Sequence, residues 1–370
     1  MLLKEVFCQD KAISILQKAL AGDKLSHAYI FSGAEGVGKF KTAREWAKLL
    51  LCKKPVIEKK FADSCGKCES CRLFEAGSHP DFNLVYKELR EFTRDGKGKP
   101  SPVDLPIDVV REFIIEKVST RPALSRKKVF VISEAERLNT ESQNCLLKVL
   151  EEPPEYCFIF LLCTRMEKLL PTIKSRCQTI SFGLIDEERI IEKLKEVGLE
   201  QKKAQYFARL SEGRLGAAMR WAQLELANAN LYQTKKGLVD SLCNCQYADA
   251  LEQAQWLTDK SKEIADVWAE LDKATSKTDI NRRASQTLVR IIISALSDAM
   301  QLNITPEKDL TNFDQKEQIK KLASRFGPEQ AAEKIAECFR TLRWVEASVN
   351  EKLIFEQLLL NLAVSGRMKV

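Results

Sequence analysis

The strongest constraint on the fold of this chain is an apolar segment near its N-terminus that runs directly into a glycine-rich loop. The sequence HAYIFSGAEGVGKF, residues 27–40, has the spacing G-x-x-x-x-G-K, with Gly33, Gly38 and Lys39 in place. A helical period resumes in KTAREWAKLLL, residues 41–51. A strand, a glycine loop and a helix in this order can hold phosphate, because backbone N–H groups and the lysine converge on its oxygens. The segment therefore predicts a P-loop α/β domain.

The other apolar segments predict a parallel sheet with helices on both faces. Apolar runs without polar alternation occur at VFVI (129–132) and CFIFLLC (157–163), and two further short strands are expected at FNLVY (82–86) and CQTISFG (177–183). Helical patterns separate them, and a capping box of Thr140 and Gln143 predicts the start of one helix. Unalternating strands are buried on both faces. From about residue 186 every period is helical, so we expect three domains: an α/β domain (1–182), a small helical lid (183–229) and an all-α domain (230–370).

Composition excludes a membrane protein and favours the cytoplasm. No run approaches the roughly 18 apolar residues of a membrane span, and the N-terminus MLLKEVFCQDK acquires charges at once. The net charge is +7, and residues 37–60 carry eight Lys or Arg against two Asp or Glu. Such a run forms either a phosphate-facing patch or a solvated helix face. Twelve cysteines in a cytosolic chain favour thiol ligands or buried thiols over disulfides.

Three of these cysteines have the spacing of a metal site. Cys65, Cys68 and Cys71 lie in the polar segment CGKCESC, and Cys52 precedes them at the end of the expected helix. Four thiolates in a closed tetrahedron describe a structural zinc site with no open position for water. We therefore predict a zinc module at residues 52–71, with His79 as the substitute for Cys52.

Two side chains that would hold magnesium are missing. The residue after Lys39 should be Ser or Thr but is Phe40, and Thr42 lies about 200° around the helix from it. After the strand at 129–132, an Asp-Glu pair should order magnesium and the attacking water, but the pair is Ser133-Glu134. Both losses argue against hydrolysis, whereas Lys39 leaves ATP or ADP binding open. The residues of this degenerate nucleotide site are Gly33, Gly36, Gly38, Lys39 and Glu134.

Taken in order, these motifs resemble bacterial clamp-loader subunits, the AAA+ proteins that open the sliding clamp for the replicative DNA polymerase. The similarity covers about residues 1–220, and its most specific motifs are LLKVLEEPP (146–154) and SRC (175–177). It implies a DNA polymerase III subunit in a hetero-oligomeric ring with motor ATPase and delta subunits. It also implies action on the sliding clamp and primer-template DNA, and a collar formed by residues 230–370.

Within the family, Phe40 and Ser133 make the chain resemble the delta-prime type more than the ATP-hydrolysing gamma/tau motor. The residues alone give Arg176 only the role of a surface arginine, but the resemblance makes it an arginine finger that acts in trans on a neighbour's ATP. By the same resemblance Thr164 takes the sensor-1 position. Arg214 departs from the Gly-Ser-x-Arg arrangement of sensor-2, and Gly216 occupies the place of its arginine.

Two other functions stay open. A gamma/tau-type motor with an unusual magnesium shell would hydrolyse ATP as an isolated chain. A zinc-containing DNA-binding protein would bind DNA by itself with a steep dependence on salt.

Overall fold

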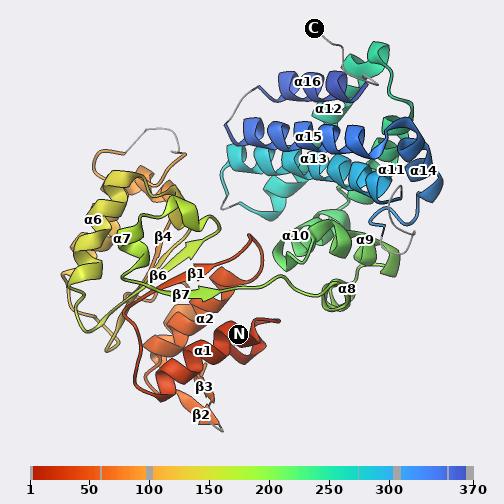
Figure 1. Cartoon of the computed structure of the whole chain (residues 1–370). Coiled ribbons are helices and arrows are strands. Elements are labelled where there is room, and N and C mark those ends of the chain that lie inside the picture. Colours follow the sequence, from red (N-terminus) through yellow and green to blue (C-terminus); the bar gives the residue numbers. More distant parts are fainter. Residues whose placement is uncertain are drawn as a thin grey trace. The chain divides into compact units, whose positions relative to one another are not determined.

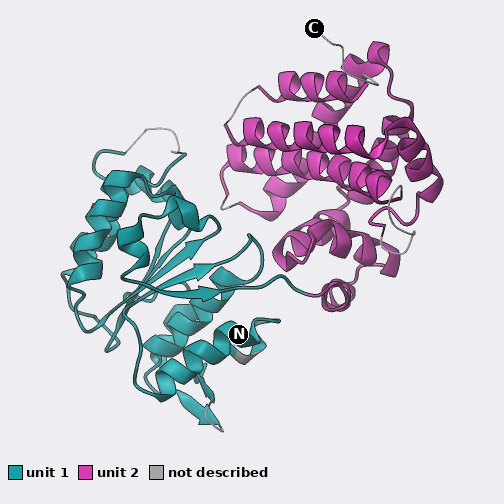
Figure 2. Cartoon of the chain, in the orientation of Figure 1, with its two compact units in different colours: residues 1–185 teal, residues 186–370 magenta. Residues whose placement is uncertain are grey.

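The computed structural model describes residues 3–58, 61–96, 103–273, 275–302, 310–347 and 350–363. The chain forms two compact units, residues 1–185 and 186–370 (Figures 1 and 2). The first unit is α/β, and every regular element among the described residues of the second is a helix. A separate lid that ends at residue 229 stays a prediction. No helix in the described ranges is long and apolar enough to cross a membrane.

The first unit alternates strands and helices. Its strands are β1 (Ala28–Ser32), β2 (Val56–Glu58), β3 (Phe61–Asp63), β4 (Phe82–Val85), β5 (Lys128–Ile132), β6 (Cys157–Cys163) and β7 (Gln178–Ser181). Its α-helices are α1 (Asp10–Ala21), α2 (Lys39–Leu51), α3 (Glu69–Glu75), α4 (Ile107–Val110), α5 (Glu116–Val118), α6 (Thr140–Glu151) and α7 (Pro171–Lys174). Short 3-10 turns lie at Leu3–Glu5, Lys87–Phe92, Ala135–Arg137 and Met166–Lys168.

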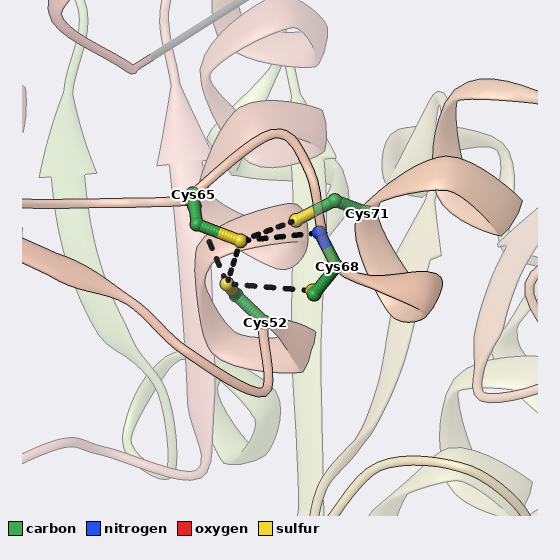
Figure 3. A group of neighbouring side chains, drawn as sticks. All are labelled: Cys52, Cys65, Cys68 and Cys71. Carbon is green, nitrogen blue, oxygen red and sulfur yellow. Dashed lines mark hydrogen bonds between the residues drawn. The ribbon is translucent and has the colours of Figure 1, made fainter.

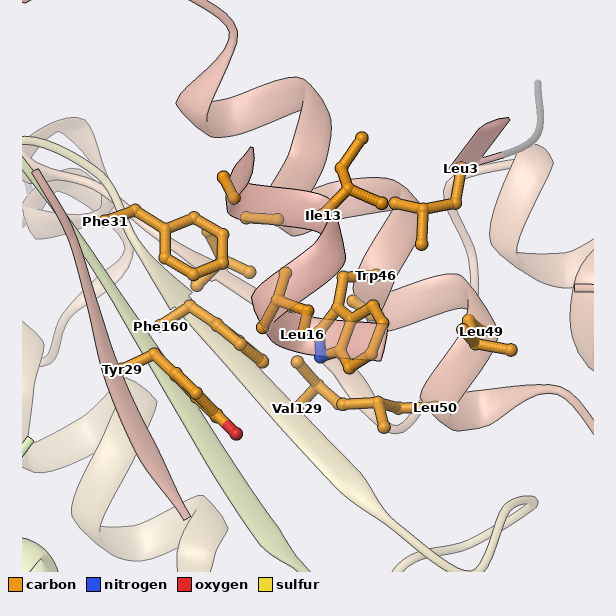
Figure 4. Close-up of a cluster of buried hydrophobic side chains, with 14 of the residues drawn as sticks. Leu3, Ile13, Leu16, Tyr29, Phe31, Trp46, Leu49, Leu50, Val129 and Phe160 are labelled. Carbon is orange, nitrogen blue, oxygen red and sulfur yellow. The ribbon is translucent and has the colours of Figure 1, made fainter. Parts of the chain in front are cut away.

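Five strands form one sheet in the order β4-β5-β6-β1-β7, and every described pairing in it is parallel. Alternate side chains of each strand enter two different cores, because successive residues of a strand point to opposite faces. On one face Tyr29, Phe31 and Phe160 pack against α1 and α2 around Trp46 (Figure 4). On the other face Ile30 and its neighbours pack against α4, α6 and α7. The predicted sheet, with helices on both faces, is confirmed.

Three local features differ from the sequence prediction. Helix α6 is capped by the side chain of Asn139, which accepts a hydrogen bond from the Ser142 N–H at 2.8 Å, so the predicted Thr140 box is wrong. The helical segment expected between the strands β4 and β5 contains a π-helical stretch, Arg111–Ile115, between α4 and α5. The cysteine-rich insertion also contains an antiparallel hairpin, β2–β3, which no apolar pattern in the sequence predicted.

The second unit consists of packed helices. They are α8 (Glu187–Glu196), α9 (Gln201–Ser211), α10 (Leu215–Leu226), α11 (Leu231–Asn244), α12 (Ala250–Leu271), α13 (Lys277–Leu302), α14 (Lys316–Arg325), α15 (Pro328–Glu346) and α16 (Glu351–Ala363), with a 3-10 turn at Tyr247–Asp249. A buried hydrogen bond of 3.1 Å from Trp221 Nε1 to Thr287 Oγ1 joins α10 to α13. The all-helical character predicted for this part is confirmed.

Candidate nucleotide and metal sites

The glycine-rich loop connects β1 to α2 and has the backbone that only glycine adopts easily. Gly33, Gly36 and Gly38 all have positive φ, at 155°, 81° and 107°. A Cβ on Gly33 would lie 2.6 Å from the Phe182 carbonyl oxygen, so no larger residue fits there. The Gly33 N–H donates to the Cys163 carbonyl at 3.2 Å, which fixes the start of the loop against β6. The loop therefore stands at the carboxyl end of the central strands, where P-loops hold phosphate.

Lys39 is buried inside this loop. Its side chain is 8% exposed, and Nζ donates to the carbonyl oxygens of Gly33 at 2.6 Å and Ala34 at 2.7 Å. Burial lowers the pKa of Lys39, and the carboxylates of Glu136 and Glu35 oppose that shift. Because the Lys39 ammonium donates to these loop carbonyls, it can give them up and donate instead to phosphate oxygens.

The magnesium position has no replacement hydroxyl near it in the sequence. Phe40 is 44% exposed. Thr42 is fully buried, and its hydroxyl donates to the Gly38 carbonyl at 3.0 Å within the helix. Ser133 begins the turn after β5, and its N–H donates to the Val85 carbonyl at 2.9 Å.

A carboxylate that the sequence reasoning missed, Glu136, contacts Thr164, the residue predicted for the sensor-1 position. The Thr164 N–H donates to Glu136 Oε2 at 3.2 Å, and the Thr164 hydroxyl donates to the same carboxylate. Glu134 has φ of 49°, is exposed, and pairs with Arg137 Nε at 3.0 Å within its own turn. The 3-10 turn Ala135–Arg137 explains why Glu136, and not Glu134, reaches Thr164, because this turn directs Glu136 towards the end of β6.

The four predicted cysteines come together around one point (Figure 3). Cys52 follows the last residue of α2, Cys65 follows β3, and Cys68 and Cys71 begin α3. The sulfur of Cys52 lies 3.6 Å from that of Cys65 and 3.9 Å from that of Cys68, and Cys65 lies 4.0 Å from Cys71. All four ligand atoms lie within 4.8 Å of one another.

These distances fit a tetrahedral ion. Zn–S bonds of about 2.3 Å place tetrahedral sulfurs roughly 3.8 Å apart. The Cys65 N–H also donates to Cys52 Sγ at 3.4 Å, and the Cys68 N–H to Cys65 Sγ at 3.3 Å. At Cys68, burial raises the thiol pKa, but hydrogen bonds from the backbone and neighbouring thiols outweigh it and lower the pKa to about 6. The cluster can therefore hold a metal such as zinc.

His79 has a different role. Its Nδ1 accepts the Asp81 N–H at 3.1 Å, and Nε2 lies 2.9 Å from Ser70 Oγ and 3.3 Å from Ser125 Oγ. Both serine hydroxyls donate to the Leu51 carbonyl, so Nε2 is the donor and the ring is neutral. Burial lowers the His79 pKa accordingly. With both nitrogens engaged, His79 buttresses the module and is not the substitute ligand for Cys52.

Arg176 lies between α7 and β7, and its side chain is 37% exposed. Its guanidinium contacts Glu151 Oε1 at 2.9 Å and donates to the Thr172 carbonyl at 3.1 Å. These contacts are the surface ion pair that the residues alone suggested, and they leave the guanidinium accessible to solvent.

Arg214, in the second unit, is held within its own turn. Its Nε donates to the Ser211 carbonyl at 2.8 Å, and its Nη2 pairs with Glu212 at 2.8 Å. Gly216 lies in the first turn of α10, as the sequence placed it.

The parallel sheet, the P-loop at the end of strand β1, the inserted cysteine module and the helical second unit define an AAA+ protein. Two family profiles match this chain, one described as "DNA polymerase III, delta subunit" over residues 8–186 and one as "DNA polymerase III, delta subunit, C terminal" over residues 246–363. Together they span most of it. The chain belongs to the family of DNA polymerase III clamp-loader subunits.

Individual relatives carry the names of two kinds of subunit. The chain is 38% identical to the DNA polymerase III subunit delta' of Pseudomonas aeruginosa over 41% of this chain and 42% of that protein. It is 32% identical to subunit delta' of Bacillus subtilis over 55% of this chain and 54% of the relative. It is also 36% identical to subunit tau/gamma of Haemophilus influenzae over 52% of this chain and 25% of that protein. The matches thus span about half or less of each relative, and identity does not separate the two kinds.

Proposed function

We propose that this chain is a delta-prime-type subunit of the DNA polymerase III clamp loader. In this role it braces a hetero-oligomeric ring of motor ATPase and delta subunits in the cytoplasm, and supports loading of the sliding clamp onto primed DNA. It contributes an arginine finger and does not hydrolyse ATP itself. A gamma/tau-type motor is the alternative, favoured by the intact glycine loop and by the likeness to tau/gamma subunits.

The observation that carries the proposal is the double loss at the magnesium site. Phe40 stands at the hydroxyl position with no oxygen to offer, and Ser133 replaces the carboxylate after β5. The nearest hydroxyl in sequence, Thr42, is buried and already donates to Gly38. Phosphoryl transfer in P-loop proteins depends on magnesium that bridges the β- and γ-phosphates. A chain without these ligands is suited to assist the hydrolysis of a neighbour.

The exposed guanidinium supports that role. Arg176 follows the short helix α7 in the family motif SRC, and its ion pair with Glu151 involves two partly exposed side chains. Exposed pairs of this kind contribute only about 0–1 kcal/mol, so the guanidinium is readily released to another anion. Arginine also presents a planar fork that matches phosphate oxygens.

The test is ATP turnover by the purified chain alone and then mixed with its motor partner. We expect no turnover by the chain alone, and a partner rate that falls when Arg176→Ala replaces the wild type. Turnover by the isolated chain that is lost in Lys39→Ala would establish the motor alternative. DNA binding by the chain alone, weakening steeply with salt, would favour the zinc-containing DNA-binding protein.

We further propose that the four-cysteine cluster holds zinc as a structural ion. Four thiolate ligands close the coordination shell and leave no position for water or substrate. The ion would join the end of α2 to the start of α3 across the β2–β3 hairpin, which contributes one fully core residue, Ala62, to the hydrophobic cluster.

A further inference from the structure

The carboxylate of Glu136 lies at the end of β6, the strand whose last carbonyl accepts the N–H of the first loop glycine. It accepts hydrogen bonds from both the N–H and the hydroxyl of Thr164, the first residue after β6. The preceding residue, Cys163, accepts the Gly33 N–H at 3.2 Å through its carbonyl. Glu136 is therefore connected to Gly33, the first glycine of the loop, through the adjacent residues Cys163 and Thr164 at the end of β6.

The same carboxylate is near enough to the loop lysine to attract its charge. Glu136 exerts the largest attraction that supports the charge of Lys39 against burial. In a P-loop the backbone N–H groups hold the α- and β-phosphates, and the lysine reaches from the β- to the γ-phosphate. A γ-phosphate on this path would lie between Lys39 and Thr164, against a carboxylate that already occupies the hydrogen-bond donors of Thr164. A phosphate and a carboxylate brought close together repel each other strongly where bulk water does not screen their charges.

We propose that the P-loop of this chain is a magnesium-independent site for a nucleoside diphosphate, and that Glu136 excludes the third phosphate. The β-phosphate replaces the carbonyls of Gly33 and Ala34 as the partner of Lys39. Magnesium is not required for binding, because Phe40 offers no oxygen and Ser133 offers no carboxylate at the two positions that would hold the ion. This inference concerns the chain's own loop and does not depend on the role of Arg176, so either can fail without the other.

The experiment is a titration of the full-length chain with ADP and with ATP, each with magnesium or with excess EDTA, by calorimetry. We expect ADP to bind at least tenfold more tightly than ATP, with no more than a twofold change on adding magnesium. Lys39→Ala should abolish binding of both nucleotides, which assigns the signal to the loop.

The substitution that isolates the carboxylate is Glu136→Gln, because it removes the charge and keeps an oxygen that accepts from Thr164. We expect ATP affinity to rise about tenfold towards that of ADP, with ADP affinity changing less than threefold. Glu167→Gln is the matched control, because Glu167 is an exposed glutamate three residues after Thr164. It should leave both affinities unchanged.

Three results would overturn the proposal, and the first two need only the wild type. One is ATP binding as tightly as ADP. The second is the absence of binding by either nucleotide. The third is a magnesium-dependent gain in ATP affinity that disappears in Glu136→Gln, which would make Glu136 a magnesium ligand instead of a barrier to the third phosphate.

Discussion

The ion pair between Arg176 and Glu151 makes a quantitative prediction about the proposed arginine finger. To reach a phosphate in a neighbouring subunit, the guanidinium must leave the Glu151 carboxylate, 2.9 Å away. The two side chains are 37% and 49% exposed, so the pair belongs to the class worth about 0.2–1 kcal/mol. Removing the carboxylate should shift the finger towards its free state by that amount.

The perturbation is Glu151→Gln in the reconstituted complex with the motor subunits. An energy of about 0.2–1 kcal/mol corresponds to roughly a 1.4- to 5-fold gain in ATP hydrolysis, if finger engagement limits the rate. Arg176→Ala should act in the opposite direction, with a loss that approaches the 10³–10⁵ that arginine fingers contribute in comparable NTPases. The assay is steady-state phosphate release from the complex.

The control is Glu152→Gln, which makes the same charge change at the exposed neighbouring position. It should leave the rate unchanged. A rate that falls with Glu151→Gln would mean that the carboxylate positions the arginine productively. No effect of Arg176→Ala would refute the finger itself.

Three further predictions test the metal module and its surroundings. Cys52→Ser should reduce bound zinc, measured by elemental analysis, from about one ion per chain and lower the melting temperature, because a ligand of a closed tetrahedral site is lost. Asp81→Ala should lower the free energy of unfolding, measured with urea, by about 3–5 kcal/mol. The buried Asp81 carboxylate accepts the N–H groups of residues 123–125 at 2.6, 2.9 and 2.7 Å. A substitution at the exposed Glu91 should change the free energy of unfolding little. The hydrogen bond from Lys48 lowers the pKa of Glu75 to about 2. The ionised Glu75 therefore stabilises the fold fully at pH above the ordinary glutamate pKa, and this contribution is lost as the pH falls towards 2. Glu75→Gln should flatten unfolding free energy against pH in that interval, and an unchanged profile would contradict the assignment.

Much of the first unit could be predicted because its sequence signals are local. Unalternating apolar runs marked the positions of β1, β5 and β6, since a strand covered on both faces has no polar side to show. The short hairpin β2–β3 carries exposed residues on one strand and few apolar ones, so it produced no such signal. The cap of α6 was misplaced by one residue because Asn139 and Thr140 are both good capping residues, and the choice depends on the backbone of the preceding turn.

The sequence by itself determined which chemistry is present. Phe40 carries no oxygen and Ser133 carries no carboxylate, so neither supplies the magnesium ligand expected at its position, and four cysteines at their spacing carry the ligand chemistry of a closed metal site. Only the tertiary structure decided which side chains meet. Glu136 and not Glu134 reaches Thr164, because the turn after β5 holds Glu134 in the left-handed region beside Arg137 and carries the next glutamate to β6. Contacts between a turn and a strand more than twenty residues away depend on backbone direction, which residue identities at either place do not specify.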